Sequence, residues 1–328
     1  MLLAGDVGAT KTSLALIAPD RGAHAPVREV TLSSNRYPSL EALVLEFLHD
    51  AGVPVERACF GVAGPVVAGR AQLTNLSWVL DEVSLVRGLG ITAVRLLNDL
   101  EATATAMPFL EAGDLTTLAP GEPVAHGAIA VIAPGTGLGA AYLTWDGTCY
   151  QAHPSEAGHT DFAPRNAHQA DLLAYLRARH DHVSYERVCS GRGLPNIYAW
   201  LKERRCDPEP PWLTEQLAAA SDPTPVIIRA ARHGGSGAAL CRATLDTFVD
   251  ILAAEAGNLA LAVMATGGVY IGGGMPLHIM PQLDCERFLT AFRNKGRLTD
   301  LLERIPVHII RTAKAALLGA SIEVIRAE

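Results

Sequence analysis

Two adjacent polar residues, Asn98 and Asp99, stand where a strand is expected to end and a helix to begin. The apolar run 93–97 predicts a buried strand, and the alanine-rich run that follows predicts a helix. Ligands of α/β proteins bind at the carboxyl ends of strands, so Asp99 occupies a position suited to a catalytic carboxylate. However, Glu101 completes a capping box with Asn98, and these residues alone favour a helix cap over catalysis.

A glycine turn near the amino terminus could bind phosphate. Residues 5–12 (Gly-Asp-Val-Gly-Ala-Thr-Lys-Thr) nearly match a Walker A loop, but Thr10 stands where that loop has glycine. A Walker A loop is also followed by a helix, whereas residues 13–18 of this chain predict a strand. We therefore expect a β-hairpin turn. Its backbone N–H groups and the Thr10 hydroxyl could bind phosphate, and Asp6 could hold Mg²⁺ through water. An ordinary β-turn explains the same residues equally well.

A second glycine turn has the same surroundings. Residues 135–140 (Gly-Thr-Gly-Leu-Gly-Ala) follow an expected strand and match the dinucleotide-binding fingerprint G-x-G-x-x-A. That fingerprint requires a crossover helix, but residues 141–144 predict another strand. We therefore expect a second phosphate-binding hairpin, and two such units along the chain predict two similar lobes.

Two acids and a histidine gather in residues 155–161. A metal-binding Glu-x-x-His pair normally lies on a long helix, which the proline and glycine of this segment disfavour, and no second pair supplies further ligands. Hydrogen bonds from Glu156 and His159 to the hydroxyls of a polyol fit the segment better. Glu186 is an isolated acid for which a solvated helix face is the default interpretation.

Length and composition narrow the class of protein. The chain has 328 residues, which is typical of two domains, with 49% hydrophobic and 19% charged residues, as in a globular enzyme. A net charge of −7 without a basic stripe disfavours nucleic-acid binding. Six scattered cysteines without a C-x-x-C pair disfavour disulfides and zinc. We expect no signal peptide, no membrane span (251–265 is too short and polar) and a cytoplasmic location.

Together and in this order, these motifs resemble the bacterial glucokinase family of the hexokinase superfamily. Each motif alone is weakly specific, but the ordered set is specific and covers the chain from end to end. The matching segments are 5–10, 61–65, 74–78, 97–99, 135–139, 156–164, 185–191 and 267–274.

The resemblance implies a two-lobed α/β fold of the actin-like ATPase (ribonuclease H-like) type. Residues 1–106 and a C-terminal helix at 312–328 would form a small α/β lobe, and residues 107–311 a larger, helix-rich α+β lobe. The active site would lie in the cleft between the lobes, which close on ATP and a hexose. The implied reaction is ATP-dependent phosphorylation of glucose to glucose 6-phosphate.

The family's functional residues carry over to matching positions. Asp99 would be the general base on the sugar 6-hydroxyl during in-line phosphoryl transfer. The sugar would be bound by Asn98, Asp99, Glu156, His159 and Glu186. The nucleotide would be bound by Gly5, Asp6, Val7, Gly8, Ala9 and Thr10, by Gly135, Thr136, Gly137 and Gly139, and by Gly272, Gly273 and Gly274 beside the adenosine. With these motifs around it, Asp99 is better explained as the catalytic base, within a helix cap that is retained.

ATP and Mg²⁺ are the implied cofactors, with the metal held by Asp6 through water and the ATP phosphates. Glucose and ATP are the expected partners, without nucleic acid or membrane, and the resemblance favours a homodimer. Three alternatives stay open: a kinase for another hexose (mannose or an amino sugar), a sugar-sensing regulator without activity, and ADP or polyphosphate as the phosphoryl donor.

The chain departs from the family pattern at four positions. Ala9 and Ala157 replace the usual glycines, so we expect a negative φ at both. Lys11 is unusual after the threonine, and Arg192 replaces the usual proline; neither has an assigned role. The related repressor and sugar-kinase group is disfavoured, because no zinc-binding cysteines follow His159.

Overall fold

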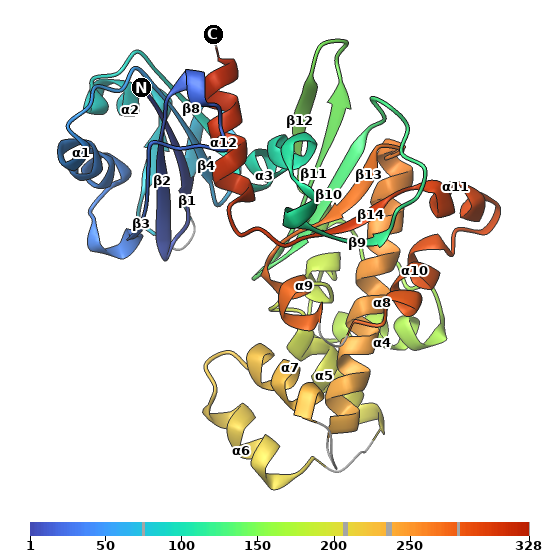
Figure 1. Ribbon diagram of the computed structural model, residues 1–328. Coiled ribbons are helices and arrows are strands. Elements are labelled where there is room, and N and C mark those ends of the chain that lie inside the picture. Colours follow the sequence, from blue (N-terminus) through green and yellow to red (C-terminus); the bar gives the residue numbers. More distant parts are fainter. Residues whose placement is uncertain (74–75, 206–208, 234–237, 281–282, 328) are drawn as a thin grey trace. The chain divides into compact units, whose positions relative to one another are not determined.

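The computed structural model describes residues 1–73, 76–205, 209–233, 238–280 and 283–327, which form two compact units (Figure 1). Thr74 and Asn75, part of one family segment, lie outside the described residues. Unit 1 comprises Met1–Asp114, Ala141–Pro154 and Thr312–Glu328, and unit 2 comprises Leu115–Ala140 and Ser155–Arg311.

A five-stranded sheet forms the centre of unit 1, in the order β3-β2-β1-β4-β8. The first two strands make the hairpin that the glycine turn predicted, and β1, β4 and β8 run parallel. The five strands are β1 (Leu2–Val7), β2 (Lys11–Ile17), β3 (Arg28–Ser33), β4 (Arg57–Val62) and β8 (Ala93–Asn98). A small second sheet joins β5 (Val66–Val67), β6 (Arg70–Gln72) and β7 (Val79–Asp81).

Alternating side chains bury both faces of this sheet. Along β1, Leu3 and Val7 belong to one buried cluster, while Leu2 and Ala4 belong to the other. The first cluster includes residues of α1 (Leu40–Ala51) and α2 (Glu82–Leu89), and the second includes residues of α3 (Asp99–Ala106) and α12 (Ala315–Arg326). Unit 1 is therefore a sheet between two layers of helices (Figure 1).

Small residues allow the α3–α12 side of unit 1 to pack closely. Ala4, Ala15, Ala102 and Ala320 are completely or almost completely buried there. Gly319 of α12 lies against the backbone of α3, so that a Cβ atom at this position would overlap the Ala102 carbonyl oxygen. Close packing places the first turn of α3 directly on the sheet.

A six-stranded sheet in the order β12-β11-β10-β13-β14-β9 supplies the strands of unit 2, although most of β11 and β12 lies within residues Ala141–Pro154 of unit 1. Its central strands β10, β13 and β14 are parallel, and β9 pairs antiparallel with β14. The strands are β9 (Leu115–Ala119), β10 (Ile129–Pro134), β11 (Leu138–Trp145), β12 (Tyr150–Ser155), β13 (Gly268–Ile271) and β14 (Val307–Ile310). A strand follows the second glycine turn, as predicted, and the dinucleotide-binding interpretation is thereby excluded.

Helices make up most of the remainder of unit 2. The longest helix, α8, is buried along most of its length, and residues of α4, α5, α7 and α10 join it in one apolar core (Figure 1). None of the described helices combines the length and the apolar character needed to cross a membrane. The helices are α4 (Ala167–Arg177), α5 (Leu194–Arg205), α6 (Pro211–Ala219), α7 (Thr224–His233), α8 (Ala238–Val263), α9 (Gly274–Ile279), α10 (Cys285–Arg293) and α11 (Thr299–Arg304).

Sequence signals explain several element ends. Asp81 caps α2, since its carboxylate accepts the Ser84 N–H at 2.8 Å. Gly52 and Gly90 end α1 and α2 in the left-handed conformation that glycine adopts easily.

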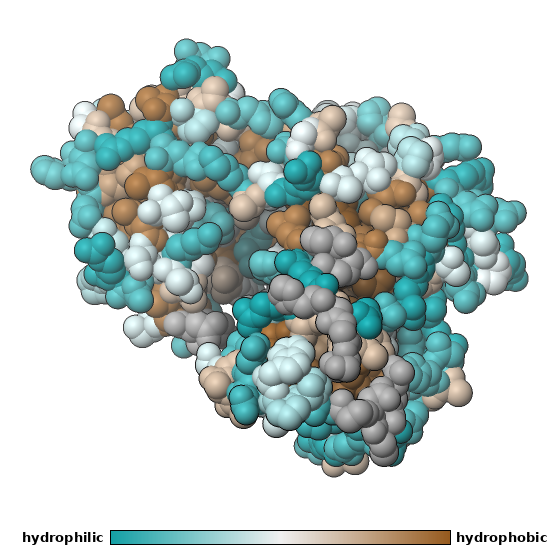
Figure 2. All heavy atoms as spheres, turned by 60° about the horizontal axis from the view of Figure 1, so that its bottom comes forward, coloured by the Kyte–Doolittle hydropathy of each residue, from teal (hydrophilic) through white to brown (hydrophobic). Residues whose placement is uncertain are grey.

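Hydrophilic residues, interspersed with hydrophobic ones, cover much of the face that Figure 2 shows.

We expect Gly319→Ala to destabilise the protein by about 3 kcal/mol, because the added methyl group must push α12 away from α3. Urea unfolding with an unchanged m-value would measure this loss. Gly113→Ala is the matched control, since a Cβ atom there meets nothing within 4 Å. Equal midpoints for both variants would show that the contact between α3 and α12 tolerates a side chain.

Candidate active site

The first candidate group lies at the carboxyl edge of the unit 1 sheet. Val7 of β1 is in register with Val62 of β4, which is in register with Asn98 of β8. The first glycine turn therefore begins two strands away from the Asn98–Asp99 pair, or roughly 10 Å at ordinary strand spacing. Parallel strands bring two motifs that are about 90 residues apart in sequence to one edge.

The capping box predicted at Asn98 is present. Its side-chain oxygen accepts the N–H groups of Leu100 (2.9 Å) and Glu101 (3.3 Å), and the Glu101 carboxylate accepts the Asn98 N–H at 3.4 Å. The Asn98 amide nitrogen donates to the Gly64 carbonyl oxygen at 3.0 Å. Asp99 begins α3, and its carboxylate accepts the Leu100 N–H at 2.9 Å. Both residues are half-buried at the start of this helix.

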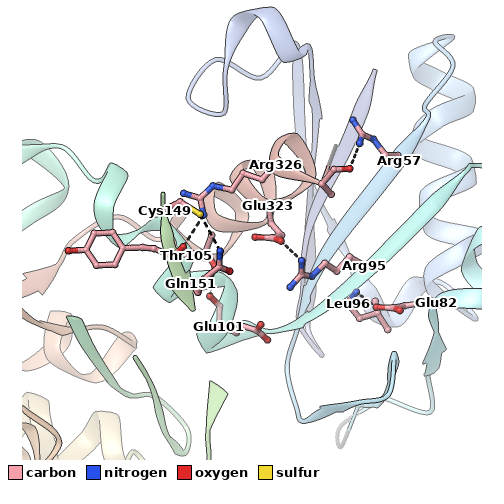
Figure 3. Close-up of polar contacts among 12 residues, drawn as sticks. Arg57, Glu82, Arg95, Leu96, Glu101, Thr105, Cys149, Gln151, Glu323 and Arg326 are labelled. Atoms are coloured by element: carbon pink, nitrogen blue, oxygen red, sulfur yellow. Dashed lines mark hydrogen bonds and ion pairs between the residues drawn. The ribbon is translucent and has the colours of Figure 1, made fainter. Parts of the chain in front are cut away.

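Neighbouring elements hold β8 in place. Figure 3 shows Arg95 of β8 and Glu323 of α12 pointing toward one another, and these side chains form an ion pair. The Leu96 N–H donates to the carboxylate of Glu82 in α2 at 2.8 Å. Gly61 of β4 admits α3, because a Cβ atom there would lie 2.9 Å from the Ala102 methyl carbon. The position of Asp99 is thus set from both faces of the sheet.

The first glycine turn is a tight hairpin supported from β3. The Gly8 N–H donates to the Lys11 carbonyl oxygen at 3.0 Å. Ser34 lies immediately after β3; its hydroxyl donates to the Gly8 carbonyl oxygen at 2.7 Å, and its N–H donates to the Thr10 carbonyl oxygen at 3.1 Å. The sequence pattern did not single out Ser34, because its role depends on pairing between β2 and β3.

Asp6 is the acid nearest this turn in sequence, and it continues the alternation of Leu2 and Ala4 toward the side of α3 and α12. Burial raises the pKa of its carboxyl, and the charge of Lys11 lowers it in part. Lys11 therefore offsets some of the electrostatic cost of an ionised Asp6. Ala9 and Ala157 are not among the residues with positive φ, as expected for alanine at these positions.

The second candidate group surrounds Leu138 in unit 2. In the second glycine turn, the Gly135 N–H donates to the Gly137 carbonyl oxygen at 2.8 Å. The Leu138 N–H donates to one carboxylate oxygen of Glu186 at 3.0 Å. Gly137 has no side chain to block this approach, since a Cβ atom there would overlap the same Glu186 oxygen. Glu186 is therefore attached to the turn and does not lie on a solvated helix face.

The Glu156–His159 loop packs on the same residue. Gly158 lies so close to the Leu138 carbonyl oxygen that a Cβ atom would overlap it. The short 3-10 helix Ala157–His159 brings the Glu156 Oε2 and His159 Nε2 atoms to 4.0 Å from each other. Both side chains are more than half exposed, at 68% and 59%, and so are accessible to a ligand.

A backbone connection joins this loop to the segment of Glu186. The Phe162 N–H donates to the Val183 carbonyl oxygen at 2.9 Å, and the Tyr185 N–H donates to the Thr160 carbonyl oxygen at 3.0 Å. Glu186 lies on the 3-10 helix Tyr185–Arg187 that follows. Unit 2 thus brings together Glu156, His159, Glu186 and the second glycine turn.

A buried polar cluster supports Tyr185 from behind. The Asn258 amide nitrogen donates to the Tyr185 hydroxyl (3.0 Å) and to the Glu255 carboxylate (2.8 Å), and Lys295 donates to Asn258 and to the Ala254 carbonyl oxygen. Burial raises the pKa of Glu255 and lowers that of Lys295. Sequence reasoning missed these residues, although a glutamate inside an apolar helix was a visible signal.

A third glycine turn, formed by Gly272, Gly273 and Gly274, adjoins the second one. The Gly272 N–H donates to the Ile132 carbonyl oxygen at 2.8 Å, and Gly273, with φ of 81°, lies against the Pro134 carbonyl oxygen, where a Cβ atom would overlap. A cavity of about 1060 Å³ opens beside both turns. It is lined by Gly135, Thr136, Gly191, Arg192, Pro195, Ser221, Asp222, Pro223, Thr224, Pro225, Ile228, Arg229, Arg232, Gly274, Met275 and His278.

Metal coordination by protein side chains alone has little support in the described part of the chain. No group of three or more His, Cys, Asp or Glu side chains there is arranged to hold an ion. A single carboxylate such as Asp6 suits Mg²⁺ that is bound mainly by water and phosphates.

The comparisons with known proteins agree over the whole chain. The family model described as Glucokinase matches residues 3–326. The glucokinase of Trichormus variabilis is 41% identical over 337 residues, with 98% of both chains covered. The crystal structure of a glucokinase from an Antarctic psychrotroph has a TM-score of 0.86 at 31% identity and covers 99% of both chains.

A more distant structure shares the fold. The ROK family glucokinase from Streptomyces griseus, solved in complex with glucose and AMPPNP, has a TM-score of 0.62 at 20% identity, with 98% of this chain and 97% of that chain covered. These similarities confirm the α/β fold of the actin-like ATPase type.

We expect Asp6→Asn to raise stability at neutral pH. An aspartate in an unfolded chain has a pKa of about 3.9, and burial raises the pKa of Asp6 in the folded protein. Between the two values the folded state binds more protons, so the stability of the native protein falls as pH rises through this window.

Thermal unfolding from about pH 4 to about pH 7 would test this, because the advantage of the asparagine variant should grow with pH. Asp20→Asn, on an exposed side chain, is the control and should show no such trend. A variant that is less stable than the native protein at neutral pH would contradict the expectation.

Proposed function

Because the chain belongs to the glucokinase family, we propose that it transfers the γ-phosphoryl group of ATP to the 6-hydroxyl of glucose, with Asp99 as general base. In this proposal, residues of both units act on the same two substrates. Asp99 and the first glycine turn come from unit 1, and Glu156, His159, Glu186 and the other two turns come from unit 2.

The shared edge of β1, β4 and β8 is the observation that carries the proposal. It supports a base at the end of β8 and a phosphate-binding turn at the end of β1, about two strand spacings apart. Phosphoryl transfer depends on the positioning of donor and acceptor and on charge stabilisation, and a rigid sheet edge suits both needs.

Several side chains retain hydrogen-bonding capacity for a sugar. The Asn98 amide has two N–H groups, and the Gly64 carbonyl oxygen accepts one of them. One oxygen of the Glu186 carboxylate accepts the Leu138 N–H, and we assign the other to a sugar hydroxyl. Glu156 and His159 would bind further hydroxyls. A sugar that lacks one of these hydroxyls would leave a polar group without its partner, which gives specificity.

The glycine turns and the adjoining cavity fit a nucleotide. Backbone N–H groups of Ala9 and Thr10 and of Thr136 and Gly137 would bind phosphate oxygens, and Gly274 would lie beside the nucleoside. Asp6 would hold Mg²⁺ through water, and the bound ion would supply positive charge that offsets the charge of the phosphates.

In the chemical step, the 6-hydroxyl oxygen of glucose attacks the γ-phosphorus in line with the bridging oxygen of ATP. The new O–P bond forms as the bond to ADP breaks, and the hydroxyl proton moves to the Asp99 carboxylate and then to solvent. The helix cap at Asn98 holds this carboxylate at the end of the strand throughout.

The alternatives are less well supported. A kinase for mannose or an amino sugar would use the same residues. However, the relative from Trichormus variabilis, which matches along 98% of both chains, is named a glucokinase. A sugar-sensing regulator has no need of a base beside two phosphate-binding turns. We propose ATP, rather than ADP or polyphosphate, as the phosphoryl donor, and the cytoplasm as the location of the protein. We also propose that the protein is a homodimer, and light scattering would test this assembly.

We expect Asp99→Asn to lower kcat by about 10²- to 10⁴-fold, with little change in glucose affinity. Asparagine keeps the side-chain oxygen that accepts the Leu100 N–H, so the start of α3 should be preserved. A coupled assay for ADP release and calorimetry with glucose would measure the two effects. Asp20→Asn serves as the matched control on an exposed residue. A near-normal kcat for Asp99→Asn would exclude this base.

Glucose is expected to have the highest kcat/KM in a panel that also contains mannose and glucosamine. We expect Glu156→Gln to lower kcat/KM for glucose by about tenfold or more, because it replaces a charged acceptor of sugar hydroxyls with a neutral amide. A better rate with mannose or glucosamine would reassign the substrate, whereas binding of sugars without ADP release would indicate a regulator.

A further inference from the structure

Arg192 is the departure from the family pattern that the proposed function leaves without a role. Its segment runs beside the second glycine turn: the Gly191 N–H donates to the Gly135 carbonyl oxygen at 2.8 Å, and the Arg192 N–H donates to the Thr136 carbonyl oxygen at 3.3 Å. A proline at position 192 could not make the second of these bonds, because it has no N–H. The arginine is therefore tied to the turn through its own backbone.

The same segment is held from its other side by α7. Thr224, which is 4% exposed, donates its hydroxyl to the Gly191 carbonyl oxygen at 2.6 Å. Its own N–H donates to the Asp222 carboxylate at 2.9 Å. The backbone at Gly191–Arg192 is thus fixed between the glycine turn and the start of α7, which limits where the Arg192 side chain can reach.

Charge in the cavity favours an anionic ligand. Arg192, Arg229 and Arg232 line it, and Asp222 is the one carboxylate among its described lining residues. The Asp222 carboxylate already accepts the Thr224 N–H, and Arg232 donates to the carbonyl oxygen of His278. None of the described lining residues is Phe, Tyr or Trp, so the cavity offers no large ring on which a base could stack.

Arg192 is better placed for phosphate than the other arginines. It hydrogen-bonds to the turn itself, whereas Arg229 lies five residues beyond Thr224, or about 7.5 Å further along α7. Guanidinium groups bind phosphate oxygens through paired N–H donors, and such charge-assisted bonds are stronger than neutral ones. The arginine adds a cation to a turn that otherwise offers N–H groups and a hydroxyl.

We propose that Arg192 binds the phosphate chain of the nucleotide donor beside the second glycine turn. The inference rests on the proposed function, which assigns this cavity to ATP, and it adds a residue that determines donor affinity. Recognition through phosphate implies that the enzyme also binds a phosphate chain without a nucleoside.

The test compares Arg192→Gln with the native enzyme. Glutamine retains the backbone N–H to Thr136 and replaces the charged guanidinium group by a shorter, neutral amide. We expect KM for ATP to rise about tenfold or more, with KM for glucose and the unfolding temperature unchanged. The KM for ATP of Arg192→Lys should fall between the values of the native enzyme and of Arg192→Gln. Arg177→Gln, on an exposed residue of α4 outside the cavity lining, is the matched control and should leave both KM values unchanged.

Two probes separate phosphate from nucleoside. Inorganic tripolyphosphate should inhibit the native enzyme competitively with ATP at fixed free Mg²⁺, and Arg192→Gln should weaken this inhibition by a similar factor. Adenosine, which has no phosphate, should bind equally to both proteins.

The outcomes separate this inference from the proposed function. A native enzyme without ATP-dependent activity on glucose would overturn the proposed function, and the inference with it. An active native enzyme whose KM for ATP does not change in Arg192→Gln would overturn the inference alone. Equal weakening of adenosine and tripolyphosphate binding would also overturn it, since the arginine would then act on the nucleoside or on the cavity as a whole.

Discussion

Close approach of neighbouring groups to the backbone at positions without side chains is the constraint on which both halves of the candidate site depend. In unit 2, the peptide groups of Leu138 meet Glu186 on one side and Gly158 on the other, and Gly137 leaves room for the Glu186 carboxylate. In unit 1, Gly61 admits the first turn of α3 to the sheet. Each glycine lets a neighbouring group lie directly against the backbone, which leaves the polar groups beside it little freedom to move.

Such rigid placement suits phosphoryl transfer, in which a protein contributes mainly geometry and fixed dipoles. The helix cap at Asn98 serves two purposes at once. The hydrogen bonds that begin α3 also orient the two side chains proposed to meet the sugar. The helix cap and the proposed sugar-binding group therefore consist of the same two residues, Asn98 and Asp99.

Much of this could be predicted from the sequence where the signal is local. Alternation and glycine turns indicated the two hairpins, and Asn98 with Glu101 indicated the capping box. Contacts across long sequence separations were not predictable: Ser34 supports the first turn only because β2 and β3 pair, and Gly158 meets Leu138 across 20 residues. Glu186 was assigned by resemblance alone, because nothing near it in sequence reveals the Leu138 N–H that it accepts. The wall that α7 adds to the cavity had no signal either, since its lining residues resemble any exposed helix face.

The close packing of α12 on α3 has a consequence for how the protein is made. Residues 315–326 complete a core cluster whose other members lie within the first 102 residues. During synthesis, the sheet that carries Asp6 and Asn98 therefore emerges with the part of this apolar face that α12 covers still exposed, and it stays so while all of unit 2 is translated. Contacts of such long sequence separation form late, and exposed apolar surface favours aggregation in the meantime. The nascent chain thus depends on α12 to complete the core of unit 1.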